Sequence, residues 1–127
     1  VELSKNDNRI EFCGEYNYSQ LENLMAEIDV VVVPSLWWEN APLTILTSFA
    51  YRIPVIASNL GGMTEVVRDG VNGFVFDVGS SKALSNVLDK IANDPNIIIE
   101  LAKNIDQSKK IEEVAFEYEV ICNKLIH

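Results

Sequence analysis

Four consecutive valines at residues 30–33 constrain the fold of this chain more than any other feature. Asp29 precedes them and Pro34 follows, so the apolar run is short and ends at a residue that cannot donate a sheet hydrogen bond. A run without polar alternation is typical of a parallel strand that helices cover on both faces. We therefore expect a buried strand here.

The rest of the chain alternates between short apolar runs and segments of helical spacing. Further strands are predicted at residues 9–13, 54–58 and 74–76, and a Gly-Gly pair breaks the chain after the run PVIAS. Strands that alternate with helices predict a parallel sheet with helices on both faces. The expected fold class is α/β and Rossmann-like.

Capping residues set the expected helix limits. Ser19 and Glu22 fit a capping box before one helix, and Asn40 is the expected N-cap of the next, with Pro42 in its first turn. Ser80 is expected to cap a fourth helix that ends near residue 93, and a last helix is expected at about 108–126. The second helix is expected to run to about residue 51 and to face the sheet with Leu43, Leu46, Phe49 and Ala50.

Composition bounds the function. The chain has 127 residues, 48% of them hydrophobic, which fits one domain, residues 1–127. A net charge of -9 argues against a nucleic-acid partner. No run is long enough to span a bilayer, no signal-peptide pattern is present, and we expect a cytoplasmic protein. Cys13 and Cys122 are expected to be buried free thiols, and no metal site is expected.

In a parallel sheet, ligands bind at the carboxyl ends of the strands. The loops expected at that edge are residues 14–18, 35–40 and 59–64. They hold most of the unusual side chains, which are Tyr16, Tyr18, Trp37, Trp38, Glu39, Asn40, Gly61 and Gly62.

These loops favour a ligand that combines phosphate with hydroxyl groups. The helix starts near Asn40 and Met63 offer free amides to phosphate. Gly61 and Gly62 permit close approach to the backbone, and Glu39 can accept hydrogen bonds from hydroxyls. Together these residues point to a nucleotide sugar.

Each of these residues also has a structural explanation. Glu39 fits a solvated acid at a helix start, Asn40 a simple cap and Gly61-Gly62 a simple turn, and the tryptophans could pack the loop on the sheet. Ser/His/Asp and Cys/His catalysis are excluded within the chain because its only histidine is His127, the last residue.

Four motifs together resemble a known family. The segments PSLWWENAPLT, IPVIAS, GGMTEVV and DGVNGFVF resemble the C-terminal, donor-binding domain of retaining GT-B glycosyltransferases, the group 1 or family 4-like enzymes. The resemblance covers roughly residues 10–93. It implies a hexosyltransferase that uses a nucleotide-diphosphate sugar as substrate, without a cofactor or metal ion.

The family signature is E-x7-E, and its first acid matches Glu39, which by resemblance contacts the donor sugar. The second acid, which usually holds the ribose hydroxyls, is replaced here by Thr47, and a helix-ending glycine is replaced by Arg52. The remaining donor contacts implied by the resemblance are Asn40, Ala41, Pro42, Leu43, Thr44, Gly61, Gly62 and, in the nucleobase loop, Tyr18.

The chain begins at Val1 without Met, and we expect it to be part of a larger protein. By resemblance, a missing N-terminal domain would bind the acceptor sugar or lipid, and a missing strand and helix would carry an Arg and a Lys for the leaving diphosphate. We expect this piece to be inactive alone, and membrane association only through missing parts. Two alternatives stay open: a degenerate non-catalytic domain, and a sugar-nucleotide epimerase or phosphorylase on the same scaffold.

Overall fold

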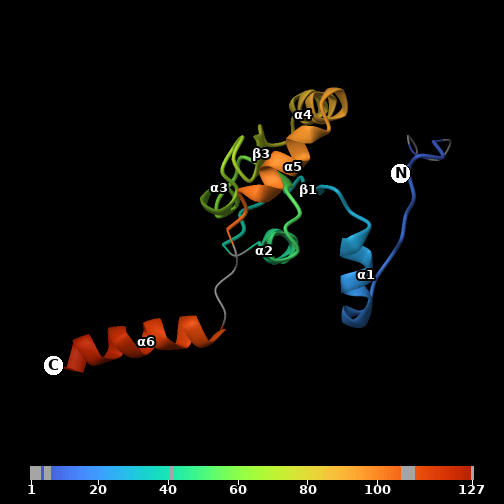
Figure 1. Cartoon of the computed structure of the whole chain (residues 1–127). Helices are drawn as coiled ribbons and strands as arrows, with labels where there is room; N and C mark the ends of the chain where they lie inside the picture. Colours follow the sequence, from blue (N-terminus) through green and yellow to red (C-terminus); the bar gives the residue numbers. More distant parts are fainter. Residues whose placement is uncertain (1–3, 5–6, 41, 107–110, 127) are drawn as a thin grey trace.

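The computed structural model describes residues 4, 7–40, 42–106 and 111–126. Figure 1 shows the chain, with helix α6 projecting away from the sheet and its helices. The elements in chain order are η1 (Tyr18–Gln20), α1 (Leu21–Ala26), β1 (Val31–Val33), α2 (Leu43–Ala50), β2 (Val55–Ser58), α3 (Met63–Val66), β3 (Gly73–Phe76), α4 (Ser81–Asn93), α5 (Asn96–Lys103) and α6 (Ile111–Ile126).

The three strands form one parallel sheet in the order β1-β2-β3. Val31 pairs with Val55, and Val55 pairs with Gly73, so the strands start in register and end at the same edge. Every residue of the central strand β2 is buried. The Rossmann-like α/β class expected from the sequence is confirmed, since helices cover both faces of the sheet.

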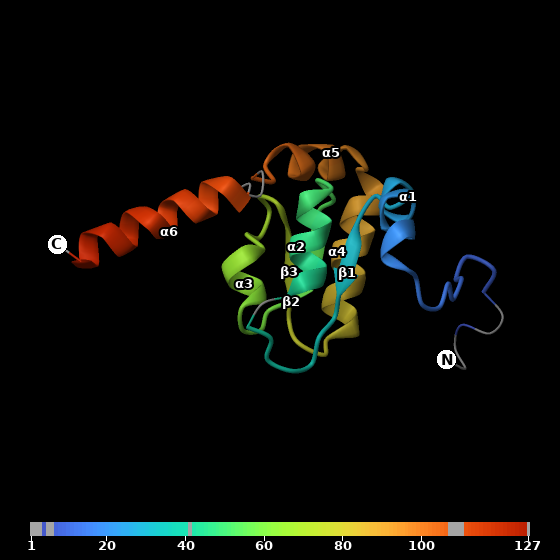
Figure 2. The ribbon, with the colours of Figure 1, turned by 90° about the horizontal axis from the view of Figure 1, so that it is seen from below.

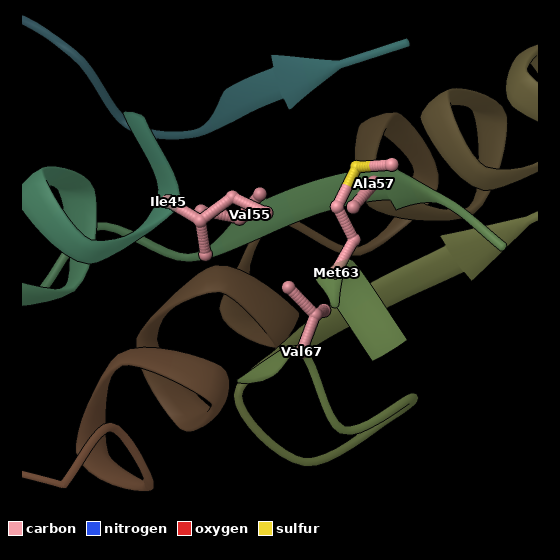
Figure 3. Close-up of a cluster of buried hydrophobic side chains, with 5 residues drawn as sticks. All are labelled: Ile45, Val55, Ala57, Met63 and Val67. Carbon is pink, nitrogen blue, oxygen red and sulfur yellow. The ribbon is translucent and has the colours of Figure 1, made fainter. Parts of the chain in front are cut away.

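Alternate residues of β2 separate two cores. Figure 3 shows one of them, where helix α2, strand β2 and the α3 region meet, formed by Ile45, Val55, Ala57, Met63 and Val67. On the other face Ile56 packs with side chains of β3, α4 and α5, namely Phe74, Phe76, Ile91 and Leu101. This period of two follows from the pleat of the strand.

Strand β1 is less buried than its valines predicted. Val32 is 37% exposed, and its two neighbours in the strand are half-buried. Among the described residues β1 pairs only with β2, so it is an edge strand. Full burial of an apolar strand needs neighbours on both sides, and that is a property of the sheet.

The predicted strand at residues 9–13 is wrong. The structure assigns no strand there, and Ile10 and Phe12 are 49% and 71% exposed. Figure 2 shows this arm beside α1, apart from the sheet. A strand is stabilised by hydrogen bonds to a neighbouring strand, and none of the described residues provides one for this segment.

Two predicted helix starts also shift. The first helical segment is preceded by Asn17, whose amide donates to Gln20 Oε1 at 2.8 Å, so the box at Ser19 and Glu22 is wrong. The capping box is formed two residues earlier, by Asn17 and Gln20, with the same i to i+3 spacing.

The N-cap of α2 is Pro42 in place of Asn40. The buried residues of α2 are Ile45 and Ser48, and Phe49 packs beside them. Leu43 and Leu46 are 72% and 44% exposed. The predicted sheet-facing side of α2 is therefore largely wrong, because both sides of the helix carry apolar residues and the spacing alone does not say which side the sheet covers.

Toward the C-terminus, the Ser80 cap of α4 is confirmed: its Oγ accepts from the Ala83 amide at 3.1 Å. Helix α5 was not predicted. Cys13 and Cys122 are free but exposed, so their predicted burial is wrong. Cys122 lies on α6, and the described side chains of this helix have no fully buried member. Within the described part of the chain, no helix has the length and apolarity to cross a membrane.

Arg52, which follows the C-cap of α2, has a φ of 59°. This is the left-handed conformation expected from the glycine that usually stands there. A side chain with a Cβ is strained in this conformation, by about 1–2 kcal/mol. Glycine would therefore adopt the backbone conformation of residue 52 at a lower energy than arginine does.

Replacing Arg52 by glycine should raise the free energy of unfolding by about 1 kcal/mol, since relief of strain exceeds the added chain entropy of glycine. Urea denaturation measures the change. The matched control is Gly70→Ala, because Gly70 has a φ of 69° and open space around its Cα. The control should lose stability, and a loss in Arg52→Gly as well would show that the Arg52 side chain stabilises the fold.

Candidate functional site

Three loops meet at the carboxyl edge of the sheet, at residues 34–40, 59–62 and 77–80 (Figure 2). The first two were predicted, and the third follows β3 and was not. The predicted loop 14–18 is not at this edge. Tyr18 is 89% exposed, and the groove that Tyr16 lines is formed by residues between 13 and 27. This separation follows from the missing strand at residues 9–13.

Glu39 is held by its own loop and by the next one. Its Oε1 accepts a hydrogen bond from Ser35 Oγ at 2.9 Å, which closes the loop from Ser35 to Glu39. Its backbone oxygen accepts from the Gly62 amide at 3.0 Å. The second carboxylate oxygen of Glu39 has no bond to a described residue. Because Glu39 is only half-buried, this oxygen can accept a further donor. The arrangement fixes the carboxylate without using all its acceptor sites.

The glycine pair has a structural role at this place. A Cβ on Gly62 would lie 2.7 Å from the Asn40 oxygen and 2.8 Å from the Glu39 oxygen. A Cβ on Gly61 would lie 2.9 Å from Cε3 of Trp38, and Gly61 has a φ of 54°. The close approach that the two glycines permit is thus used by the Glu39 loop itself. Trp38 covers Gly61 even though its side chain is 77% exposed.

Helix α2 begins beside Glu39. Pro42, which is buried, accepts bonds from the amides of Ile45 and Leu46, so the amides of Leu43 and Thr44 are the first-turn donors without a bond to a described residue. Such amides at a helix N-terminus favour an anion. Asn40 and the side chain of Thr44 are exposed, and Ala41 lies outside the described residues.

The second expected phosphate position, at Met63, is not formed. Helix α3 has only four residues, and the amide of Gly62 at its N-cap already donates to Glu39. Thr64 Oγ1 donates to the Gly61 oxygen at 3.1 Å, which stabilises the turn. The segment supports the Glu39 loop.

Thr47 lies on the second turn of α2 and is half-buried. The threonine side chain is shorter than the glutamate of the signature, so its hydroxyl lies closer to the helix than a carboxylate would. The sequence interpretation missed Ser35, although its spacing of four residues from Glu39 was available. It also missed Leu36, whose Cδ2 lies 3.8 Å from the Cβ position of Gly79 in the third loop.

The comparisons with known proteins agree with this geometry. The family model described as glycosyl transferases group 1 matches residues 2–111. A galactosyltransferase of Escherichia coli, UDP-Gal:alpha-D-GlcNAc-diphosphoundecaprenol alpha-1,3-galactosyltransferase, is 31% identical over 86 residues. These residues are 68% of this chain but 22% of that relative, so the chain spans less than a quarter of its length.

Solved structures show the same fold. HepE of Anabaena in complex with UDP-glucose matches 78% of this chain, and 27% of its own, with a TM-score of 0.71 and 31% identity. Sucrose-phosphate synthase from Thermosynechococcus elongatus matches 99% of this chain, and 32% of its own, with a TM-score of 0.80 and 26% identity. The neighbours are GT-B glycosyltransferases, and the matching part is a domain of the C-terminal type.

Gly62→Ala should displace the Glu39 loop. The backbone φ of Gly62 is -61°, which alanine adopts freely, so the cost comes from the two carbonyl oxygens. We expect a loss of about 1–3 kcal/mol in unfolding free energy, as for other overpacked sites. Faster hydrogen exchange of the residue 62 amide should accompany it, because that amide donates to Glu39.

The control is Gly14→Ala, which adds a Cβ in open space at a φ of 72°; it should lose some stability but leave exchange at residue 62 unchanged. Wild-type stability together with wild-type exchange in Gly62→Ala would contradict the close contact between the two loops.

Proposed function

The chain belongs to the glycosyl transferases group 1 family, and we propose that it supplies part of the donor site of an enzyme that uses a nucleotide-diphosphate sugar. The enzyme would transfer the sugar to an acceptor hydroxyl with retention of anomeric configuration, as hexosyltransferases of this family type do. Sugar transfer from a UDP-sugar is named for the Escherichia coli relative, and HepE was solved with UDP-glucose. Both support a donor of this class.

The observation that carries the proposal is the fixed position of Glu39. Its carboxylate is oriented by Ser35 and has a second oxygen without a bond to any described residue, at the edge of the sheet where ligands of α/β proteins bind. Hydroxyl groups of a sugar can donate to that oxygen. A carboxylate would repel a phosphate at the same place, so the diphosphate belongs beside it.

The diphosphate is proposed to lie over the start of α2. The amides of Leu43 and Thr44, which have no bond to a described residue, are available there, next to Glu39 in the chain. Backbone amides at a helix N-terminus stabilise phosphate oxygens. Asn40, Ala41 and Pro42 complete this segment, and Thr47 would face the ribose by the match to the signature.

Catalysis is proposed to consist of positioning and charge stabilisation. The bond between the anomeric carbon and the diphosphate oxygen breaks, a bond to the acceptor oxygen forms, and the acceptor proton leaves. Fixed donors that stabilise the departing diphosphate lower the barrier. Metal independence is part of the proposal because the sequence has no Asp-x-Asp motif, and it rests on the family resemblance.

The proposal treats this chain as one part of the enzyme. It spans 22% of the Escherichia coli relative and 32% of sucrose-phosphate synthase, so relatives hold much more chain than this domain. The other part is proposed to provide most of the binding site for the acceptor sugar or lipid and to complete the donor site. The chain alone is accordingly proposed to be inactive.

One observation favours a second candidate, a degenerate domain that no longer binds a nucleotide. Thr47 cannot replace both acceptor oxygens of the glutamate that the signature has at this position. Calorimetric titration of the full-length protein with UDP, GDP and ADP separates the two candidates. Binding of one nucleotide supports the donor site, and binding of none supports the degenerate domain.

Glu39→Ala in the full-length protein should lower kcat/KM by about 10–100-fold, the loss expected when a charged hydrogen bond is removed. Stability should change little, since the only side-chain bond of Glu39 to a described residue is the one from Ser35. Asp89→Ala, an exposed acid on α4, is the matched control and should retain full activity. Turnover of Glu39→Ala near that of the control would remove Glu39 from the donor site.

Thr47→Glu should tighten nucleotide binding about tenfold, because a carboxylate can accept bonds from both ribose hydroxyls. Calorimetry with the nucleotide that binds wild type measures the change. Thr47→Gln has the same length without the charge and should gain less. Equal or weaker binding by Thr47→Glu would place the ribose elsewhere.

A further inference from the structure

Three consecutive apolar side chains are exposed beside Glu39. Leu36, Trp37 and Trp38, which we name the apolar rim, are 65%, 66% and 77% exposed. They lie in the loop at the carboxyl end of β1, and the chain contains no other tryptophan. Exposed apolar patches of this kind mark binding surfaces. The rim is continuous with the proposed donor site because Glu39 follows it directly.

Two members of the rim lie near glycines of the neighbouring loops. Leu36 approaches Gly79 in the loop after β3, and Trp38 covers Gly61 in the loop after β2. Trp37 stands between them, midway along the loop that the bond from Ser35 to Glu39 closes. The loop that carries Trp37 is thus closed by a hydrogen bond while the Trp37 side chain remains largely open to solvent.

The charges around the rim select its partner. Residues 35–44 contain one ionisable side chain, Glu39, and residues 59–64 contain none. The loop after β3 adds Asp77, and the net charge of the chain is -9. An anionic lipid surface would be repelled by this environment. A neutral sugar ring suits it, because the ring places C–H groups on an indole and hydroxyl groups toward carboxylates.

We propose that Trp37 is a stacking platform for the sugar ring of the acceptor. The inference rests on the proposed function, in which Glu39 and the start of α2, both after Trp37 in the chain, hold the donor. The platform is on the other side of Glu39 along the loop. In the proposal, a ring that stacks on Trp37 lies next to the donor sugar, since Trp37 is two residues from Glu39, and apart from the diphosphate, since the start of α2 comes after Glu39.

The test measures acceptor and donor kinetics separately in the full-length protein. The acceptor probes are the methyl glycosides of glucose, galactose, mannose and N-acetylglucosamine, each with UDP-glucose and UDP-galactose as donors. In Trp37→Ala the acceptor KM should rise about tenfold, the size of a lost aromatic contact with its buried area. The donor KM should stay within about twofold, since the donor contacts are elsewhere.

Two substitutions at the same position serve as matched controls. Trp37→Phe keeps an aromatic face and should restore most of the acceptor affinity. Trp37→Leu keeps apolar volume without that face and should behave like Trp37→Ala. Leu88→Ala, an exposed apolar residue of α4, should leave both KM values unchanged. Circular dichroism spectra of all variants verify that each one is folded.

Several outcomes would overturn the inference. An unchanged acceptor KM in Trp37→Ala would overturn it. A wild-type acceptor KM in Trp37→Leu would also overturn it, because any apolar side chain would then suffice, which would indicate general apolar docking to protein. A shift in donor KM alone would assign Trp37 to the donor.

Loss of binding to phosphatidylglycerol vesicles in Trp37→Ala, with an unchanged acceptor KM, would assign the rim to a lipid surface and overturn the inference. A wild type that binds no nucleotide and transfers no sugar would fail the proposed function, and the inference with it. Transfer by wild type with an unaffected Trp37→Ala fails the inference alone.

Discussion

The parallel pairing of β2 with β1 and β3 is the interaction on which the rest of the structure depends. It buries every residue of β2 and places Val55 and Ala57 on one face and Ile56 on the other. Because the three strands run in the same direction, their carboxyl ends meet at one edge. The loops that carry Glu39 and the glycine pair are neighbours for that reason alone.

Glycine at positions 61 and 62 turns this neighbourhood into a defined site. The two loops approach so closely that a Cβ on Gly62 would overlap two carbonyl oxygens. The contact orients Glu39 through its backbone, while Ser35 orients its carboxylate. A group held by two independent bonds loses little further freedom when a ligand binds, and this preorganisation favours tight binding. Trp38 adds an apolar cover over the same turn.

The sequence predicted the sheet well and the details of its helices less well. Continuous apolar runs identify β1, β2 and β3 because burial demands apolar side chains in a parallel sheet. The segment at residues 9–13 alternates apolar and polar residues and also predicts a strand, yet none of the described residues pairs with it. The face of α2 was misjudged because both sides of this helix carry apolar residues, and only packing against the sheet selects the side with Ile45 over the side with Leu46. Cys13 and Cys122 were expected to be buried and are exposed, because burial of a side chain depends on which segments pack against it.

What the sequence determined by itself was the α/β class, the three paired strands and the family, because these follow from local composition and motif spacing. The tertiary structure decided which loops share the edge, what the glycine pair contacts and which apolar residues stay exposed. Gly61 and Gly62 were interpreted as space for a ligand, and they accommodate the backbone of Glu39 and Asn40. The physical reason is that contacts between distant loops are set by strand pairing, which no local pattern encodes.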